Sequence, residues 1–312
     1  KHCGICGSDI HYYLYGENGG RKIIEPLMLG HEFVGEVTEL GSKAKRFKLG
    51  DRVIVNPASI CRKCKFCRSD KTNLCENVSF FGSAASLPHV QGAFREKIEI
   101  NESQCYNILD DVNYQEAAFA EPLAVSLHAT SFIKNYENKK ILISGCGPIG
   151  LLILKILLKI CDNKNIFIVD INNKVLEGAK KLGVKNIFNV EQSDSFIKEF
   201  KNYFNVAFES SGNIHSINNI INTTNKGGSI IQVGNMPGGL LKIAYNNIML
   251  KELKLFGSYR FGKEFNEAVN LINKKIYTFS DMLTHSFKLE DCEQAMKIAS
   301  NKDLSIKVQI FN

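Results

Sequence analysis

The stretch "KKILISGCGPIGLLILKILLKI", residues 139–160, decides the fold class of this chain. It begins with a short apolar run, passes through a turn with the pattern G-x-G-x-x-G, and ends in an amphipathic, helix-like segment. The glycines of the turn are Gly145, Gly147 and Gly150. In such a unit the first glycine permits a tight turn, the second lets the backbone approach a pyrophosphate, and the third allows close helix–strand contact. The stretch therefore predicts a dinucleotide site with the phosphates at a helix N-terminus.

The residues that follow extend this prediction to the rest of the cofactor. "NIFIVD" reads as a second strand that ends at Asp170, from which a carboxylate can reach the ribose hydroxyls. Because a carboxylate repels a 2′-phosphate, we expect NAD to be preferred over NADP, with Lys174 partly offsetting the repulsion. Later turns at the carboxyl ends of strands should also line the site. The predicted cofactor contacts are Gly145, Gly147, Pro148, Ile149, Gly150, Asp170, Lys174, Val233 and Gly234.

The pattern on either side of the glycine turn predicts the domain organisation. After it, the helix-like "KVLEGAKKLGV" is followed by the strand-like runs "NIFNV", "NVAFES", "SIIQVG" and "LKLFGS", which indicates a doubly wound, mainly parallel sheet. Before residue 120, glycine turns separate short β-like runs such as "FVGEVTEL", "DRVIVNP" and "FREKIEI". We predict an α/β protein with a β-rich catalytic domain in residues 1–122, the nucleotide-binding domain in 123–258, and a return to the first domain in 259–312.

Composition excludes several classes of protein. The 312 residues are 44% hydrophobic and 23% charged, which is typical of a soluble globular protein with room for two cores. No apolar run reaches membrane-spanning length. The net charge of +7 comes from lysines scattered along the chain, so we predict neither nucleic acid nor membrane as a partner. Ten cysteines are too sparse for a disulfide scaffold and fit thiolates kept reduced in the cytoplasm.

A cysteine cluster between residues 61 and 75 predicts a metal site. The stretch "CRKCKFCRSDKTNLC" has the spacing C-x2-C-x2-C-x7-C, with thiols at Cys61, Cys64, Cys67 and Cys75. A shell of four thiolates leaves no open position for substrate, so we predict a structural zinc. Disulfides or free core thiols are the alternative interpretation.

Ligand-type side chains also gather in three separate segments of the β-rich domain. "CGICGSDIHYY" contains Cys6, Ser8, Asp9 and His11, "LGHEF" contains His31 and Glu32, and "FAEPLA" contains Glu121. A thiolate, an imidazole and a carboxylate suit a catalytic zinc, which takes three protein ligands and keeps one position open. Taken singly, each residue has a structural interpretation, such as a buried hydrophobe for Cys6 or a helix N-terminal charge for Glu121. We assign structural roles to His89, His128, His215 and His285.

Together these motifs resemble the zinc-dependent medium-chain alcohol dehydrogenase family over essentially the whole chain. The matching segments are "CGICGSDIHYY", "LGHEFVGEV", "GDRV", the four-cysteine loop, "EPLAVSLHA", "GCGPIG" and "GSYRF". The resemblance implies a GroES-like catalytic domain, a Rossmann domain, one catalytic and one structural zinc, NAD or NADP, and a homo-oligomer (dimer or tetramer). In the family a longer segment precedes "CGICGSD", whereas five residues precede Cys6 here. We therefore expect the printed chain to lack the family's first strands.

The resemblance also implies the ligands of the catalytic zinc. Cys6, His31 and Glu121 fall on the three ligand positions. Glu32 falls on the position of a carboxylate that approaches the metal when water or substrate exchanges. Asp9 matches a carboxylate that orients the histidine ligand, a role that suits an acceptor beside a metal-bound imidazole.

Within the family, the run "FFGSAASLPHVQGAF" most resembles the L-idonate 5-dehydrogenase branch. This implies reversible hydride transfer between C5 of L-idonate and NAD, with Ser8 and His11 as the proton relay and with Tyr12 and Arg260 as substrate contacts. Oxidation of a neutral polyol such as sorbitol, L-iditol or xylitol is the alternative, and Arg260 discriminates because a sugar acid needs a cationic partner. Two further alternatives are a zinc-binding, nucleic-acid-associated protein and a noncatalytic relative that only binds the cofactor.

Overall fold

The computed structural model describes residues 1–191 and 194–312. It divides the chain into two compact units, one formed by Lys1–Ala124 with Arg260–Asn312 and the other by Val125–Tyr259. The sequence predicts the domain boundaries between residues 122 and 123 and between residues 258 and 259. Over the described residues, no helix is both long enough and apolar enough to cross a membrane.

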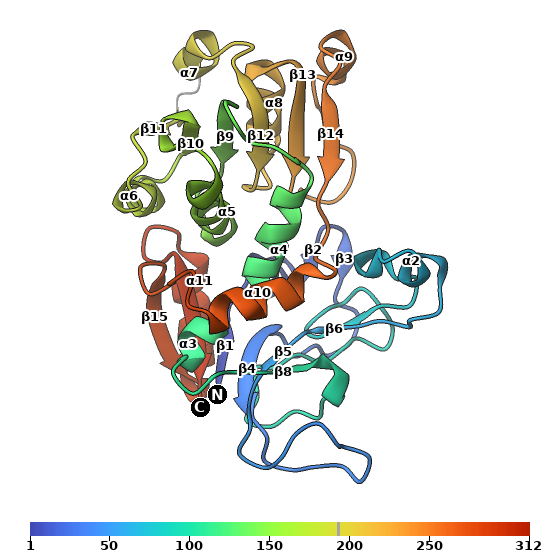
Figure 1. Cartoon of the computed structure of the whole chain (residues 1–312). Coiled ribbons are helices and arrows are strands. Elements are labelled where there is room, and N and C mark those ends of the chain that lie inside the picture. The colour runs from blue at the N-terminus through green and yellow to red at the C-terminus, as the bar shows by residue number, and fades with distance from the viewer. Residues whose placement is uncertain (192–193) are drawn as a thin grey trace. The chain divides into compact units, whose positions relative to one another are not determined.

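The first unit is built on a six-stranded mixed sheet (Figure 1). Its strands, in spatial order, are β15 (Leu283–Lys288), β16 (Lys307–Phe311), β1 (His2–Gly4), β4 (Glu32–Glu36), β5 (Arg52–Val55) and β8 (Cys105–Asn107). Only β15 and β16 pair in parallel, and β16 pairs antiparallel with β1. The last strand of the chain therefore lies beside the first, and the two termini are neighbours.

Short elements connect the strands of this sheet. The helices are α1 (Gly7–Tyr15), α2 (Lys65–Arg68), α3 (Tyr114–Ala117), α10 (Glu264–Asn273) and α11 (Cys292–Ser300), with the 3-10 turns η1 (Thr72–Leu74), η2 (Glu102–Gln104) and η4 (Leu289–Asp291). Two small two-stranded antiparallel sheets pair β2 (Glu17–Asn18) with β3 (Arg21–Lys22) and β6 (Ala58–Ser59) with β7 (Ser79–Phe80). The prediction of a strand over residues 94–100 is wrong. Phe94, Ile98 and Ile100 pack on the core beside Phe33 and Val53, but this segment forms no β-ladder.

The second unit is a six-stranded parallel sheet with helices. Its spatial order is β11 (Asn186–Asn189), β10 (Ile166–Asp170), β9 (Ile141–Ser144), β12 (Phe204–Glu209), β13 (Thr224–Gln232) and β14 (Lys254–Gly257). The helices are α5 (Pro148–Ile160), α6 (Asn173–Lys181), α7 (Asp194–Glu199), α8 (Ile214–Thr223) and α9 (Tyr245–Leu250), with η3 (Asn163–Asn165), and α4 (Ala120–Ser131) crosses the boundary between the units. The predicted α/β class with a doubly wound sheet is confirmed.

Burial explains why the sequence forms this second sheet. Every residue of β9 is buried, as expected of a central parallel strand covered on both faces. Helix α5 begins at Pro148, whose fixed φ suits the first helical position, and it buries residues 150–157. The glycine turn is thereby held between a buried strand and a buried helix.

Candidate active site

Cys6 occupies the turn between β1 and α1. It is the N-cap residue of α1, and its backbone N–H donates to Asp9 Oδ2 at 2.9 Å. Asp9 is completely buried, so this cap is protected from water. The contact fixes the Cys6 backbone, and Cys6 is half-buried at the N-terminus of α1.

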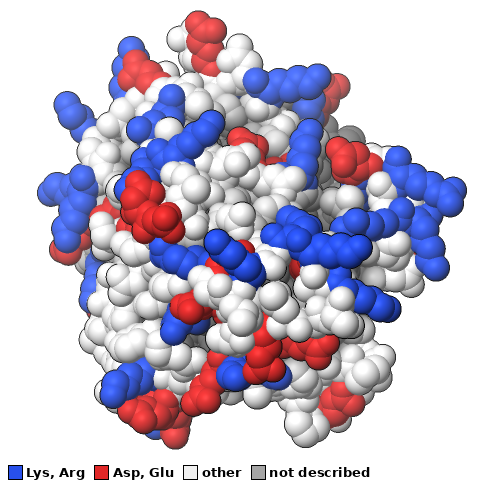
Figure 2. Space-filling model, turned by 60° about the horizontal axis from the view of Figure 1, so that its bottom comes forward, with Lys and Arg blue, Asp and Glu red and all other residues white. Residues whose placement is uncertain are grey.

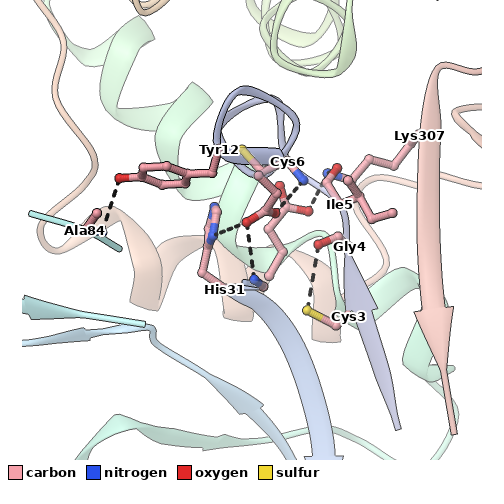
Figure 3. Close-up of polar contacts among 11 residues, drawn as sticks. Cys3, Gly4, Ile5, Cys6, Tyr12, His31, Ala84 and Lys307 are labelled. Atoms are coloured by element: carbon pink, nitrogen blue, oxygen red, sulfur yellow. Dashed lines mark hydrogen bonds and ion pairs between the residues drawn. The ribbon is translucent and has the colours of Figure 1, made fainter. Parts of the chain in front are cut away.

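The same buried carboxylate also organises the segment that carries His31. Asp9 Oδ1 accepts the Gly30 N–H at 3.2 Å and lies 3.5 Å from His31 Nδ1. Burial opposes protonation of His31, but Asp9 and Cys6 outweigh it and hold the pKa of His31 well above its usual value. Asp9 thus makes the contact expected of a carboxylate that orients His31 (Figure 3).

Two glycines that the sequence reasoning missed support the turn before His31. A Cβ at Gly92 would lie 2.2 Å from the Leu29 carbonyl oxygen, and one at Gly82 would lie 3.0 Å from the Gly30 backbone. Gly30 itself has φ +95°, which favours glycine. These close approaches involve residues far apart in sequence, so no local signal marks them.

The structure brings Cys6 and His31 together with Glu32. A sulfur, a ring nitrogen and a carboxylate oxygen from these three side chains lie within 4.8 Å of one another. These donor types fit a zinc ion. Glu121, the third predicted ligand, lies outside this set; burial raises its pKa to about 7, against the lowering effect of His31. The structure therefore brings Cys6 and His31 together, and the carboxylate that completes this donor set is Glu32, not Glu121.

A buried lysine that the sequence did not mark lies beside this set. The Lys307 ammonium pairs with the Glu32 carboxylate and donates to the Ile5 carbonyl oxygen at 3.0 Å. A single lysine at the start of the terminal run "KVQIF" carries no sequence signal, because only the pairing of β16 with β1 brings it here.

The remaining predicted side chains of this unit surround the same region. Ser8 and His11 lie on α1, half-buried, three residues apart and hence on one face of the helix. Tyr12 is buried, and its hydroxyl accepts the Ala84 N–H at 3.2 Å (Figure 3). The position of Tyr12 is therefore fixed by loop 82–90.

Arg260 and His31 both contact the ring of Phe80. Its guanidinium carbon lies 4.0 Å from the centre of the Phe80 ring, and the Phe80 and His31 ring centres are 5.5 Å apart. Arg260 adopts φ +53°, an unusual conformation for a residue with a side chain. It also lines a polar pocket with Asn56 and Tyr106.

The four cysteines of the loop form a second donor set. Their sulfur atoms lie within 4.8 Å of one another, and none of the four is paired in a disulfide. Backbone N–H groups of Lys63 and Cys64 lower the pKa of Cys61 to about 6. Cys64 caps α2, and Cys61 N–H donates to Cys75 Sγ at 3.3 Å. This closed, all-sulfur arrangement fits a structural zinc.

The predicted nucleotide turn has the geometry its glycines require. Gly145 has φ +94°, and a Cβ on Gly150 would lie 1.9 Å from the Gly145 carbonyl oxygen. A Cβ on Gly147 would meet no protein atom within 4 Å, so packing does not demand this glycine, whereas close approach of a pyrophosphate would. Asp170 accepts the Cys146 N–H at 2.6 Å, which ties the end of β10 to the turn.

The later turns of this unit are joined by a buried carboxylate. Glu209 accepts the Gly212 N–H at 3.1 Å and the Gln232 side-chain amide at 2.7 Å. Its carbonyl oxygen accepts the N–H groups of Val233 and Gly234. Lys174 lies in the first turn of α6, where its N–H donates to Asn172. The predicted contacts thus lie at the carboxyl ends of β9, β10 and β13.

Comparison with known proteins follows the same division. Residues 1–110 match the family model described as "Alcohol dehydrogenase GroES-like domain", and residues 148–274 match "Zinc-binding dehydrogenase". The chain is 36% identical to L-idonate 5-dehydrogenase (NAD(P)(+)) of Escherichia coli K12, over 98% of this chain and 89% of that protein. It is 32% identical to sorbitol dehydrogenase of Bacillus subtilis, over 99% and 87%. The crystal structure of the Escherichia coli L-idonate 5-dehydrogenase superposes with a TM-score of 0.92 at 35% identity, covering 100% of this chain and 89% of that one.

Proposed function

The chain belongs to the zinc-binding alcohol dehydrogenase family, and from this premise we propose that it is an L-idonate 5-dehydrogenase. The reaction is reversible oxidation of the C5 hydroxyl of L-idonate to give 5-keto-D-gluconate. The observation that supports the proposal is that Arg260 and His31, within the same unit, contact the same ring of Phe80.

The residues of the first unit have distinct roles in this proposal. Cys6, His31 and Glu121 are the proposed ligands of the catalytic zinc, with Glu32 as the exchanging carboxylate. When bound, zinc polarises an alcohol oxygen as a Lewis acid, and NAD or NADP accepts the hydride. Ser8 accepts a hydrogen bond from the substrate hydroxyl, takes up its proton while releasing its own towards His11 on the same face of α1, and His11 passes that proton to solvent.

Arg260 provides the basis for choosing a sugar acid. A guanidinium can hold a carboxylate through two parallel charge-assisted hydrogen bonds, which a neutral CH2OH group cannot match. In L-idonate the carboxylate and the C5 hydroxyl are at opposite ends of a short chain. A cation that shares the Phe80 ring with His31 therefore suits a substrate that presents its hydroxyl to the zinc and its carboxylate to Arg260.

Oxidation of a neutral polyol is the second candidate. It is supported by the 32% identity with a sorbitol dehydrogenase over nearly the whole chain. It is also compatible with Arg260 stacked on Phe80, because a stacked guanidinium can still donate to hydroxyls.

The test is an NAD- and NADP-reduction assay of the full-length protein with L-idonate, D-gluconate, sorbitol and L-threonine. We expect the highest kcat/KM for L-idonate with NAD. A higher kcat/KM for sorbitol would overturn the sugar-acid proposal in favour of the polyol. Absence of turnover with all four, in protein that holds zinc, would contradict both.

We further propose that the protein acts as a homo-oligomer in the cytoplasm. The edge strand β14 exposes Leu255, and the neighbouring α9 exposes Tyr245 and Met249, which leaves an apolar sheet edge open to pairing. Ten free thiols fit a reducing compartment. Both signs of charge are interspersed on the face shown in Figure 2, which does not favour a nucleic-acid partner. Sedimentation velocity tests the proposed homo-oligomer, and a purely monomeric protein would contradict it.

A further inference from the structure

His89 connects loop 82–90 to the segment that follows β3. The residue is 5% exposed, so its polar contacts are shielded from water. The ring atom Nε2 accepts the Ile24 N–H at 3.1 Å, and Nδ1 lies 2.9 Å from the Ser86 carbonyl oxygen. Because a backbone N–H only donates and a carbonyl oxygen only accepts, the ring is a neutral imidazole with its proton on Nδ1. One ring nitrogen thus binds within the loop, and the other binds across to residue 24.

Neighbouring contacts strengthen this connection. The His89 backbone N–H donates to the Glu25 carboxylate, and the Gln91 side-chain oxygen accepts the Met28 N–H at 2.7 Å. The segment that receives these contacts, residues 24–28, belongs to no helix or strand. Its position relative to loop 82–90 is therefore set by individual hydrogen bonds, among which those of the His89 ring are the most buried.

The same loop also contacts residues of the proposed active site. Near its start, Gly82 lies against the backbone of Gly30, one residue before His31. The Ala84 N–H then donates to the Tyr12 hydroxyl oxygen at 3.2 Å (Figure 3). A phenol oxygen that accepts one hydrogen bond still carries a proton, which it can donate to a second partner. The contact with Ala84 therefore determines the direction in which the Tyr12 O–H points.

Between Ala84 and His89 the chain makes an exposed excursion. Ser83 and Val90 close its base through two backbone hydrogen bonds of 3.3 Å. At the tip, Leu87 is 64% exposed, so packing of this side chain contributes little to holding the excursion in place. The polar contacts of His89 at one end and of Ala84 at the other therefore decide how the loop lies.

We propose that His89 is a positioning residue for substrate binding, which holds loop 82–90 so that Ala84 fixes the Tyr12 hydroxyl as a hydrogen-bond donor to the substrate. The inference rests on the proposed function, in which Tyr12 contacts the substrate. His89 acts through Ala84 and Tyr12 and not on the reacting atoms. Because Tyr12 donates to an oxygen other than the one that is oxidised, its contact is made equally in the ground state and the transition state. Loss of the contact therefore raises KM and leaves kcat nearly unchanged.

The experiment compares two amide substitutions of His89. In His89→Gln the side-chain oxygen reaches the place of Nε2 and can accept the Ile24 N–H. The side chain in His89→Asn is one methylene shorter and keeps only the contact with Ser86. Both variants retain the backbone N–H that donates to Glu25. His215→Asn is the matched control, because His215 is exposed and lies in the other unit.

Two kinds of measurement are made on the full-length protein. Steady-state kcat and KM are determined with L-idonate or, if the wild type prefers it, with sorbitol. Hydrogen–deuterium exchange of the backbone amides of residues 82–90 reports opening of the loop without any substrate. We expect His89→Asn to raise KM about 3- to 20-fold, as for one lost hydrogen bond, and to change kcat less than about twofold. Exchange in the loop should become about tenfold faster.

The other single variants have opposite expectations. His89→Gln should restore KM and exchange to near the wild-type values, because it keeps the contact across to residue 24. His215→Asn should leave all three quantities unchanged. Ile24→Pro removes the N–H that His89 accepts, and no buried side chain is altered because Ile24 is exposed. It should reproduce the higher KM of His89→Asn, and it provides the same comparison if His89→Asn fails to fold.

A double variant tests whether the effect passes through Tyr12. Tyr12→Phe removes the hydroxyl group that the loop positions. The double variant Tyr12→Phe/His89→Asn should therefore have the KM of Tyr12→Phe alone, which is the non-additivity expected of residues that act through one contact.

Three results would overturn the inference. Faster exchange in His89→Asn with an unchanged KM would mean that the loop does not position Tyr12. An equal rise in KM with and without the Tyr12 hydroxyl would mean that His89 acts on something else. A fall in both kcat and thermal midpoint that His89→Gln shares would mean that His89 only supports the fold. Failure of the sugar-acid proposal is visible separately, in the wild type alone, as a higher kcat/KM for sorbitol than for L-idonate.

Discussion

Replacing Arg260 with alanine distinguishes the two candidate reactions, because it should lower kcat/KM more for a sugar acid than for a neutral polyol. The Arg260 guanidinium stacks on Phe80 at 4.0 Å, and this contact serves any substrate, so its loss should affect both reactions equally. Only an acid substrate also loses a bidentate pair with its carboxylate. In a half-buried setting that pair should contribute about 2–4 kcal/mol, or roughly 30- to 1000-fold in kcat/KM. The ratio of the two losses therefore isolates the carboxylate contact.

The assay measures kcat/KM of wild type and Arg260→Ala for L-idonate and for sorbitol under the same conditions. Arg62→Ala is the matched control, because Arg62 lines the same pocket and is exposed. It should change neither kcat/KM by more than about threefold, as expected of a surface substitution. Equal losses on both substrates in Arg260→Ala would refute the reasoning and move the neutral-polyol reaction ahead.

Other substitutions test the zinc and cofactor assignments. Cys64→Ser should lower the thermal midpoint and remove one zinc per chain, because a closed thiolate site contributes directly to folding. Cys6→Ser should abolish turnover while the circular dichroism spectrum and melting curve change little; the reverse pattern for the two variants would exchange their roles. Asp170→Ser, with Lys174 retained, should shift the kcat/KM ratio towards NADP by removing repulsion of the 2′-phosphate. An unchanged ratio would mean that Asp170 does not face the ribose.

The second unit could be predicted from sequence because its signals are local. The strand, glycine turn and helix of residues 139–160 occur in one continuous stretch, and each later strand is an apolar run of its own. The error at residues 94–100 arose in the first unit, where alternating Phe94, Ile98 and Ile100 resemble a strand. There the side chains pack on the core but the backbone has no neighbouring strand to pair with. A local pattern records burial, and it does not record a hydrogen-bonding partner.

The two zinc sites differ in predictability for the same reason. The four-cysteine set is contained within residues 61–75, so spacing alone predicted it. The other predicted set draws on the turn between β1 and α1, the turn before β4, and α4, and its members were joined only through resemblance to a family. The supporting contacts of Gly82 and Gly92 cross between distant segments and had no signal at all.

The relation between Glu32 and Glu121 shows what a motif leaves undetermined. The sequence "GHE" places a carboxylate next to His31 wherever it occurs, but it does not say whether that carboxylate is free to bind a metal. Here Glu32 pairs with the buried Lys307, which donates to the Ile5 carbonyl oxygen across a separation of 302 residues, and the Glu32 carboxylate lies against Gly4. Adding a side chain at Gly4 would create a clash, and removing Lys307 would leave a buried charge uncompensated. Lys307, Gly4 and Glu32 come from three adjacent strands of the folded sheet, so no local motif in the sequence could have brought them together.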